Sequence, residues 1–66
     1  MRVVINGEAK EVPEGLNLRS LLDHLSLPHQ RIAVEVDKHV VRKADWEQTP
    51  VGVDTHIEIV HFVGGG

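Results

Sequence analysis

The sequence predicts an α+β domain in which one amphipathic helix packs on one face of a mixed β-sheet. Short runs rich in Val and Ile occur near both ends of the chain and are bounded by turn residues, as is typical of strands. Between them, one segment repeats Leu at helical spacing. The 66 residues suffice for one small domain, which we expect to span 1–63 with a tail at 64–66.

The chain opens with a predicted hairpin. Residues 2–5 form an apolar run, and Asn6-Gly7 is a strong signal for a two-residue turn. Residues 8–12 are therefore expected to pair back as a second strand. Pro13, Glu14 and Gly15 then break this strand.

The helix is predicted to start after Asn17, whose side chain can accept a hydrogen bond from a free backbone N–H of the first turn. Leu16 and Leu21 occupy the positions of a hydrophobic staple. Leucines at positions 18, 21, 22 and 25 make one face apolar. Because Pro28 cannot continue a helix, we expect the helix to end at or before Leu27.

The second half of the chain predicts three further strands. Residues 32–36 alternate between two faces, and Asp37-Lys38 is a plausible turn into a short strand at 39–41. Residues 42–48 are too few for a stable helix on their own and are expected to form a single turn, in which Trp46 covers one edge of a small core. The last strand is predicted at 56–63 because this run is rich in Ile and Val and free of Pro and Gly.

The order of elements predicts the topology. Since the chain begins and ends with strands, the simplest closed arrangement pairs these two strands in parallel at the centre of a sheet of four to five strands. This is the β-grasp arrangement of ubiquitin. The predicted core between helix and sheet consists of Val3, Ile5, Leu18, Leu21, Leu22, Leu25, Val34, Val36, Ile57 and Ile59.

Three glycines follow the last strand. A side-chain-free tail directly after a strand presents the α-carboxylate of Gly66, and we interpret this group as the reactive part of the molecule. The alternative is an ordinary glycine-rich chain end or a remnant of cloning. The direct succession of strand and glycines, without a polar spacer, favours the functional interpretation.

A second candidate feature is the sheet face that points away from the helix. If Ile57, Ile59 and Val63 face the helix, then Val60 and Phe62 face the other way together with Glu58. Val4 has matching parity and is expected beside them, with Ala33 as a more distant candidate. We interpret Val4, Val60 and Phe62 as an exposed apolar patch for partner binding; the alternative is surface hydrophobic residues without a role.

Composition excludes several function classes. With 7 basic and 10 acidic residues, the net charge of −3 disfavours binding to nucleic acids or to anionic membranes. There is no Cys, and the five His residues show no metal-ligand spacing, so no metal site is expected. The N-terminus lacks the apolar region of a signal peptide, so the expected location is the cytoplasm.

Two segments carry a resemblance to a known family. Val-Val-Arg-Lys-Ala-Asp-Trp-Glu at 40–47 has a basic residue four positions before Trp46, and Ile-Glu-Ile-Val at 57–60 runs on to Val-Gly-Gly-Gly at 63–66. In these segments the chain resembles the ThiS family, the sulfur carriers of thiamin biosynthesis. One departure is Asp54-Thr55, where the family usually has Gly-Asp; Asp tolerates a left-handed conformation, so we expect a slightly altered turn.

The resemblance implies a function that is not enzymatic. A ubiquitin-activating-like enzyme would use ATP to adenylate the Gly66 carboxylate, and a sulfur-delivering enzyme would then convert it to a thiocarboxylate that thiazole synthase consumes. Gly65 and Gly64 would give the tail access to a narrow channel, and the carrier itself would bind no cofactor. Two alternatives remain open at this point: a sulfur carrier for molybdopterin or tRNA thiolation, and a ubiquitin-like interaction module.

Overall fold

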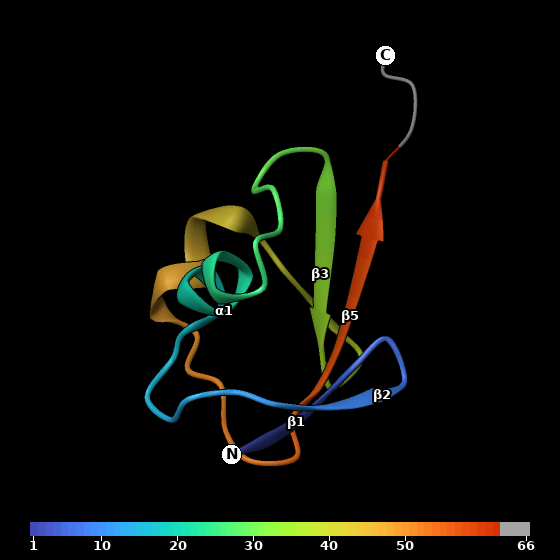
Figure 1. Ribbon diagram of the computed structural model, residues 1–66. Helices are drawn as coiled ribbons and strands as arrows, with labels where there is room; N and C mark the ends of the chain where they lie inside the picture. Colours follow the sequence, from blue (N-terminus) through green and yellow to red (C-terminus); the bar gives the residue numbers. More distant parts are fainter. Residues whose placement is uncertain (63–66) are drawn as a thin grey trace.

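The computed structural model describes residues 1–62 and contains a five-stranded mixed sheet with one α-helix and one 3-10 helix. Figure 1 shows both helices on the same side of strands β3 and β5. The elements, in chain order, are β1 (Arg2–Ile5), β2 (Glu8–Glu11), α1 (Leu18–His24), β3 (Ile32–Val36), β4 (His39–Val41), η1 (Lys43–Gln48) and β5 (His56–His61).

The strand order is β2-β1-β5-β3-β4. The first and last strands pair in parallel, and all other neighbours are antiparallel. The last strand therefore lies at the centre of the sheet, between β1 and β3. This arrangement confirms the predicted α+β, β-grasp fold.

Asn6 extends the short parallel pairing of β1 with β5. The ladder comprises only Val4 opposite His56 and Ile5 opposite Ile57, after which the chain turns away at Asn6 with a φ of 50°. The Asn6 side chain then accepts a 2.7 Å hydrogen bond from the Ile59 N–H and donates a 3.3 Å bond to the Ile59 carbonyl. The side-chain amide of Asn6 thus makes the two hydrogen bonds to Ile59 that a further backbone residue of β1 would otherwise make.

The start of α1 confirms the predicted cap. The Ser20 N–H donates to Asn17 Oδ1 at 2.8 Å, and the Asn17 N–H donates to Ser20 Oγ at 2.9 Å. The two residues therefore satisfy each other's backbone donors, with Ser in the place that Glu or Gln usually takes in a capping box.

Helix α1 ends at His24, four residues before Pro28. The Leu27 N–H donates to the Leu22 carbonyl at 2.9 Å and the Ser26 N–H to the Asp23 carbonyl at 3.0 Å, the two bonds of a Schellman motif. Ser26 occupies the left-handed position of this motif with a φ of 57°. The helix ends within the predicted limit, and the Schellman motif satisfies the carbonyls of its last turn.

The core lies between α1, η1 and the sheet. Eight of the ten predicted core residues are buried, whereas Leu25 and Val36 are partly buried and pack against the others. Trp46, which was predicted to cover one edge of the core, belongs to the buried cluster: it is 2% exposed, and its Nε1–H donates to the Val41 carbonyl at 3.0 Å. The remaining buried residues outside the prediction are Val12, Ile32 and Val51.

Two strand bounds differ from the predicted ones. β2 ends at Glu11 rather than Val12, and β5 ends at His61, with Val63 outside the described residues. Within residues 1–62, no helix has the length and hydropathy needed to cross a membrane.

Candidate functional site

The candidate site begins where β5 ends. The Phe62 N–H donates a 2.7 Å hydrogen bond to the Arg31 carbonyl, so the backbone remains tied to the sheet one residue beyond β5. Arg31 adopts a left-handed φ of 61°. Figure 1 shows this end of β5 at the opposite end of the molecule from the N-terminus. The predicted reactive residues Gly64, Gly65 and Gly66 lie outside the described residues.

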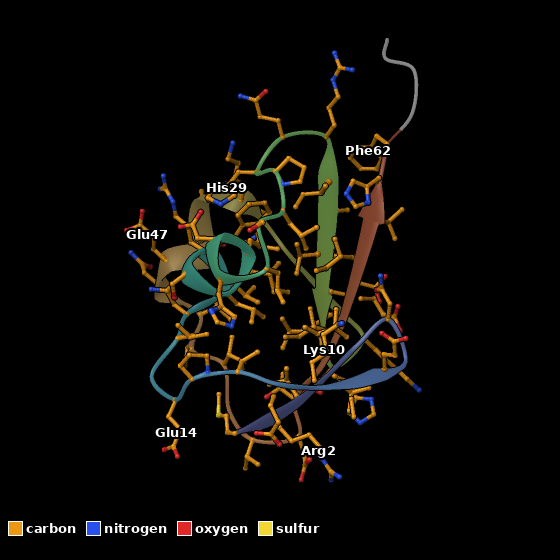
Figure 2. All side chains as sticks on the ribbon, in the orientation of Figure 1. Arg2, Lys10, Glu14, His29, Glu47 and Phe62 are labelled. Atoms are coloured by element: carbon orange, nitrogen blue, oxygen red, sulfur yellow. The ribbon has the colours of Figure 1, made fainter. Side chains whose placement is uncertain are left out.

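The sheet face that points away from the helices carries the predicted partner-binding residues. Val60 is 52% and Phe62 58% exposed, and Val4 is half-buried. Figure 2 shows Phe62 at the tip of the described chain, away from α1. We call this surface the open face. The predicted exposure of Val60 and Phe62 is confirmed, and their role in binding stays a prediction.

The register corrects the predicted neighbours of Val60. Ala33 lies directly opposite Val60 in the β3–β5 pair, whereas Val4 lies opposite His56. Val4 is therefore beside the start of β5, and Ala33, expected to be more distant, is the immediate neighbour. The reason is that the parallel pairing of β1 involves only the first residues of β5, a register that residue parity alone does not reveal.

Two further features of the open face were not predicted. Val40 on β4 lies opposite Glu35 and is 70% exposed. Glu35 in turn lies directly opposite Glu58. The parity of β3 and β5 indicated that Glu35 and Glu58 could share this face, but only the cross-strand register shows that the two carboxylates are paired.

The histidines do not form a metal site in the part of the chain that the structure describes, where no group of three or more potential ligands gathers. His29 instead belongs to the helical layer. Its Nε2 lies 2.7 Å from Asp23 Oδ1, and its ring meets Trp46 edge-on with 6.1 Å between centroids. These contacts connect the segment after α1 to η1.

The turn before β5 is the place where the sequence departs from the family pattern. Asp54 adopts a left-handed φ of 61°, as expected for an Asp that replaces Gly. Its Oδ1 accepts a 2.8 Å bond from Arg2 Nε. The side chain thus contributes a contact between this turn and β1 that Gly could not make.

The fold and the exposed open face beside a glycine-rich end define a β-grasp protein of the ubiquitin-like class. Comparison with known proteins narrows the class. Residues 3–66 match the model of the ThiS family, and the chain belongs to this family. The family resemblance of segments 40–47 and 57–66 is thereby confirmed.

Solved structures agree with this assignment. The crystal structure of the thiamine biosynthesis protein ThiS from Geobacter metallireducens superposes with a TM-score of 0.87 at 29% identity and covers 100% of both chains. A solution structure of a thiamine biosynthesis protein from the same organism gives a TM-score of 0.80 at 28% identity, covering 100% of this chain and 88% of that one.

Curated relatives fall into two groups. A thiazole synthase of Paramagnetospirillum magneticum is 35% identical over 66 residues, which are 100% of this chain and 20% of that protein. The chain thus spans about a fifth of the length of this relative. The uncharacterized protein ycf40 of Porphyra purpurea is 33% identical over 64 residues, covering 97% of this chain and 90% of that protein.

Proposed function

We propose that this chain is a sulfur carrier of thiamin biosynthesis whose working group is the carboxylate of Gly66. The observation that carries the proposal is the ThiS-family match, which extends through the three C-terminal glycines. A ubiquitin-activating-type enzyme uses ATP to join this carboxylate to AMP with release of pyrophosphate. A hydrosulfide ion supplied by a sulfur-delivering enzyme then attacks the carbonyl carbon; the bond to AMP breaks, AMP and a proton leave, and the thiocarboxylate forms without a change of oxidation state.

The chemistry explains why the tail consists of glycine. A carboxylate is a poor electrophile, so adenylation supplies the leaving group, and the partner must align the tail with ATP. Without Cβ atoms, Gly64 and Gly65 allow a narrow channel to contact the backbone from several sides. The carrier is a co-substrate in this scheme, and the catalytic groups belong to its partners.

The proposed acceptor of the sulfur is thiazole synthase. Relatives that bear this name include a segment similar to the whole of this chain. These relatives thus carry a segment similar to this chain within a polypeptide named thiazole synthase. This arrangement supports a functional interaction between the carrier and thiazole synthase. We therefore propose that thiazole synthase takes the sulfur from the Gly66 thiocarboxylate to build the thiazole ring.

The direct test is the intact mass of the protein after incubation with ATP, the adenylating enzyme and a sulfur source. The expected product is heavier by the exchange of one oxygen for sulfur. Deleting Gly66, or adding one residue after it, should abolish this gain, and Gly65→Val should slow it through steric conflict in the channel. Circular dichroism should show all three variants folded, because the changes lie beyond β5.

A truncated protein that gains sulfur at the normal rate would contradict the proposal. Genetic complementation provides a second test. The gene should rescue a thiamin auxotroph that lacks its own carrier and should not rescue a molybdopterin auxotroph. The reverse result would assign the carrier to the other pathway.

A further inference from the structure

The open face carries three of the four strongly exposed large hydrophobic residues of the described chain. Among residues 1–62, four large hydrophobic residues are strongly exposed, namely Val40, Val53, Val60 and Phe62. All except Val53 lie on this one face: Val40 on β4, Val60 on β5 and Phe62 one residue beyond β5. Ala33, opposite Val60, adds to this apolar strip, which runs across β4, β3 and β5. Exposed apolar residues clustered in this way are typical of a protein-binding surface.

Two carboxylates interrupt this strip. Glu35 and Glu58 are direct cross-strand partners, which places their Cβ atoms roughly 4.5–5.5 Å apart. Like charges in this position destabilise a sheet. Neither carboxylate forms an ion pair within residues 1–62, whereas Glu8, Glu47 and Asp54 each pair with a Lys or Arg side chain. The fold by itself therefore leaves this repulsion uncompensated.

A cation placed between the two carboxylates would remove the repulsion. Arg suits the position because its planar guanidinium offers several donors to two carboxylates at once. Apolar residues lie on two sides, with Val40 opposite Glu35 and the Ala33–Val60 pair next along the strands. A partner that covers them would exclude water and so strengthen the ion pairs.

Other occupants fit this surface poorly. A second copy of the chain would bring four carboxylates together, and nucleic acid or an anionic membrane would be repelled. Residues 63–66, Val-Gly-Gly-Gly, contain no cation. Charge and apolar character together select a protein surface that is both basic and apolar.

We propose that the open face docks the activating enzyme through an arginine that sits between Glu35 and Glu58 and an apolar pocket that receives Phe62 and Val60. This inference rests on the proposed function, which supplies the partner. Glu35 and Glu58 destabilise the free carrier and stabilise the complex.

The test is the affinity of the folded carrier for the purified adenylating enzyme, measured by calorimetry at several salt concentrations. Glu58→Gln keeps the side-chain shape and removes the charge. We expect its dissociation constant to rise about tenfold or more, because it leaves the partner's cation partly unpaired. The salt dependence should also become weaker, while the melting temperature stays the same or rises. Glu35→Gln should behave in the same way.

Glu14→Gln is the matched control. It makes the same change in net charge, and Figure 2 shows Glu14 at the opposite end of the molecule from Phe62. Its affinity should equal that of the unchanged protein. Equal affinities of the Glu58→Gln and Glu14→Gln variants would overturn the docking proposal, as would a marked fall in the melting temperature of Glu58→Gln, which would make the pair structural.

The same samples separate this inference from the proposed function. If the unchanged carrier forms the thiocarboxylate but its affinity does not depend on Glu58, only the docking proposal fails. If the unchanged carrier binds the enzyme and forms no thiocarboxylate, the proposed function fails and the partner assignment fails with it.

Discussion

The two faces of the sheet are built from the same strands but differ in burial. On the helix side, alternate residues of β1, β3 and β5, such as Val3, Val34 and Ile57, are at most 1% exposed. On the open face the intervening residues include Val60 and the Glu35–Glu58 pair. Both sets are compatible with extended backbone, so strand propensity alone does not distinguish them. Burial under the helices makes one set essential for stability and leaves the other free to serve recognition.

The largest expected effect on stability comes from a substitution in the core between the helices and the sheet. Leu22 is 0% exposed, and Leu22→Ala should lower the free energy of unfolding by about 2–5 kcal/mol because it leaves a cavity. Val60→Ala on the open face should change it by less than about 0.5 kcal/mol. Chemical denaturation of both variants makes the comparison, and similar midpoints would contradict the division between the faces.

A smaller effect is expected where β1 joins β5. Asn6→Gly tolerates the left-handed φ but removes both hydrogen bonds to the Ile59 backbone. The unpaired N–H and carbonyl should cost about 1–3 kcal/mol of unfolding free energy. The same denaturation assay provides the measurement. An unchanged midpoint would show that water replaces the Asn6 amide without loss.

The open face should respond in affinity rather than in stability. Phe62→Asp removes a 58% exposed ring and should lower the free energy of unfolding by less than about 1 kcal/mol. Binding to the adenylating enzyme should weaken by a much larger factor, and Phe62→Leu should retain part of it. Melting curves and calorimetry test this together. Loss of the fold would make Phe62 a core residue, and unchanged affinity would deny it a binding role.

The smallest expected effect involves neither face. Asp37 and Lys38 form a two-residue hairpin turn with φ of 48° and 72°, and positive φ at both positions favours Gly at the second. Lys38→Gly should raise the unfolding free energy by about 0.5 kcal/mol, because relief of the left-handed strain exceeds the entropy that glycine adds to the unfolded chain. Chemical denaturation shows whether the unfolding free energy of the variant rises or falls, and a fall would refute the prediction. Asp37 is kept because its Oδ1 accepts a bond from the His56 N–H.

Much of the fold could be predicted because its signals are local. The alternation in 32–36, the Asn6-Gly7 turn and the Asn17 cap each depend on a few adjacent residues, and the structure reproduces all three. The central parallel pair followed from the order of elements. Local signals and global topology agree in this chain.

The parts that escaped prediction depend on contacts distant in the sequence. Val12 and Val51 lie in segments without periodicity, so no pattern marks them as buried. The burial of Trp46 depends on η1 packing beside α1. At the open face, parity identified Val60 and Phe62, but Val40 and the Glu35–Glu58 pair depend on cross-strand register.

The central position of β5 has a consequence for how the molecule is made. Its partners β1 and β3 have no other route to form one sheet, so a chain emerging from the ribosome cannot complete its fold until His56–His61 has left the exit tunnel. A nascent chain that ends at Thr55 should therefore remain unfolded and open to proteases, which pulsed proteolysis can measure. The strand that joins the two halves of the sheet is thus the last of the described strands to be synthesised.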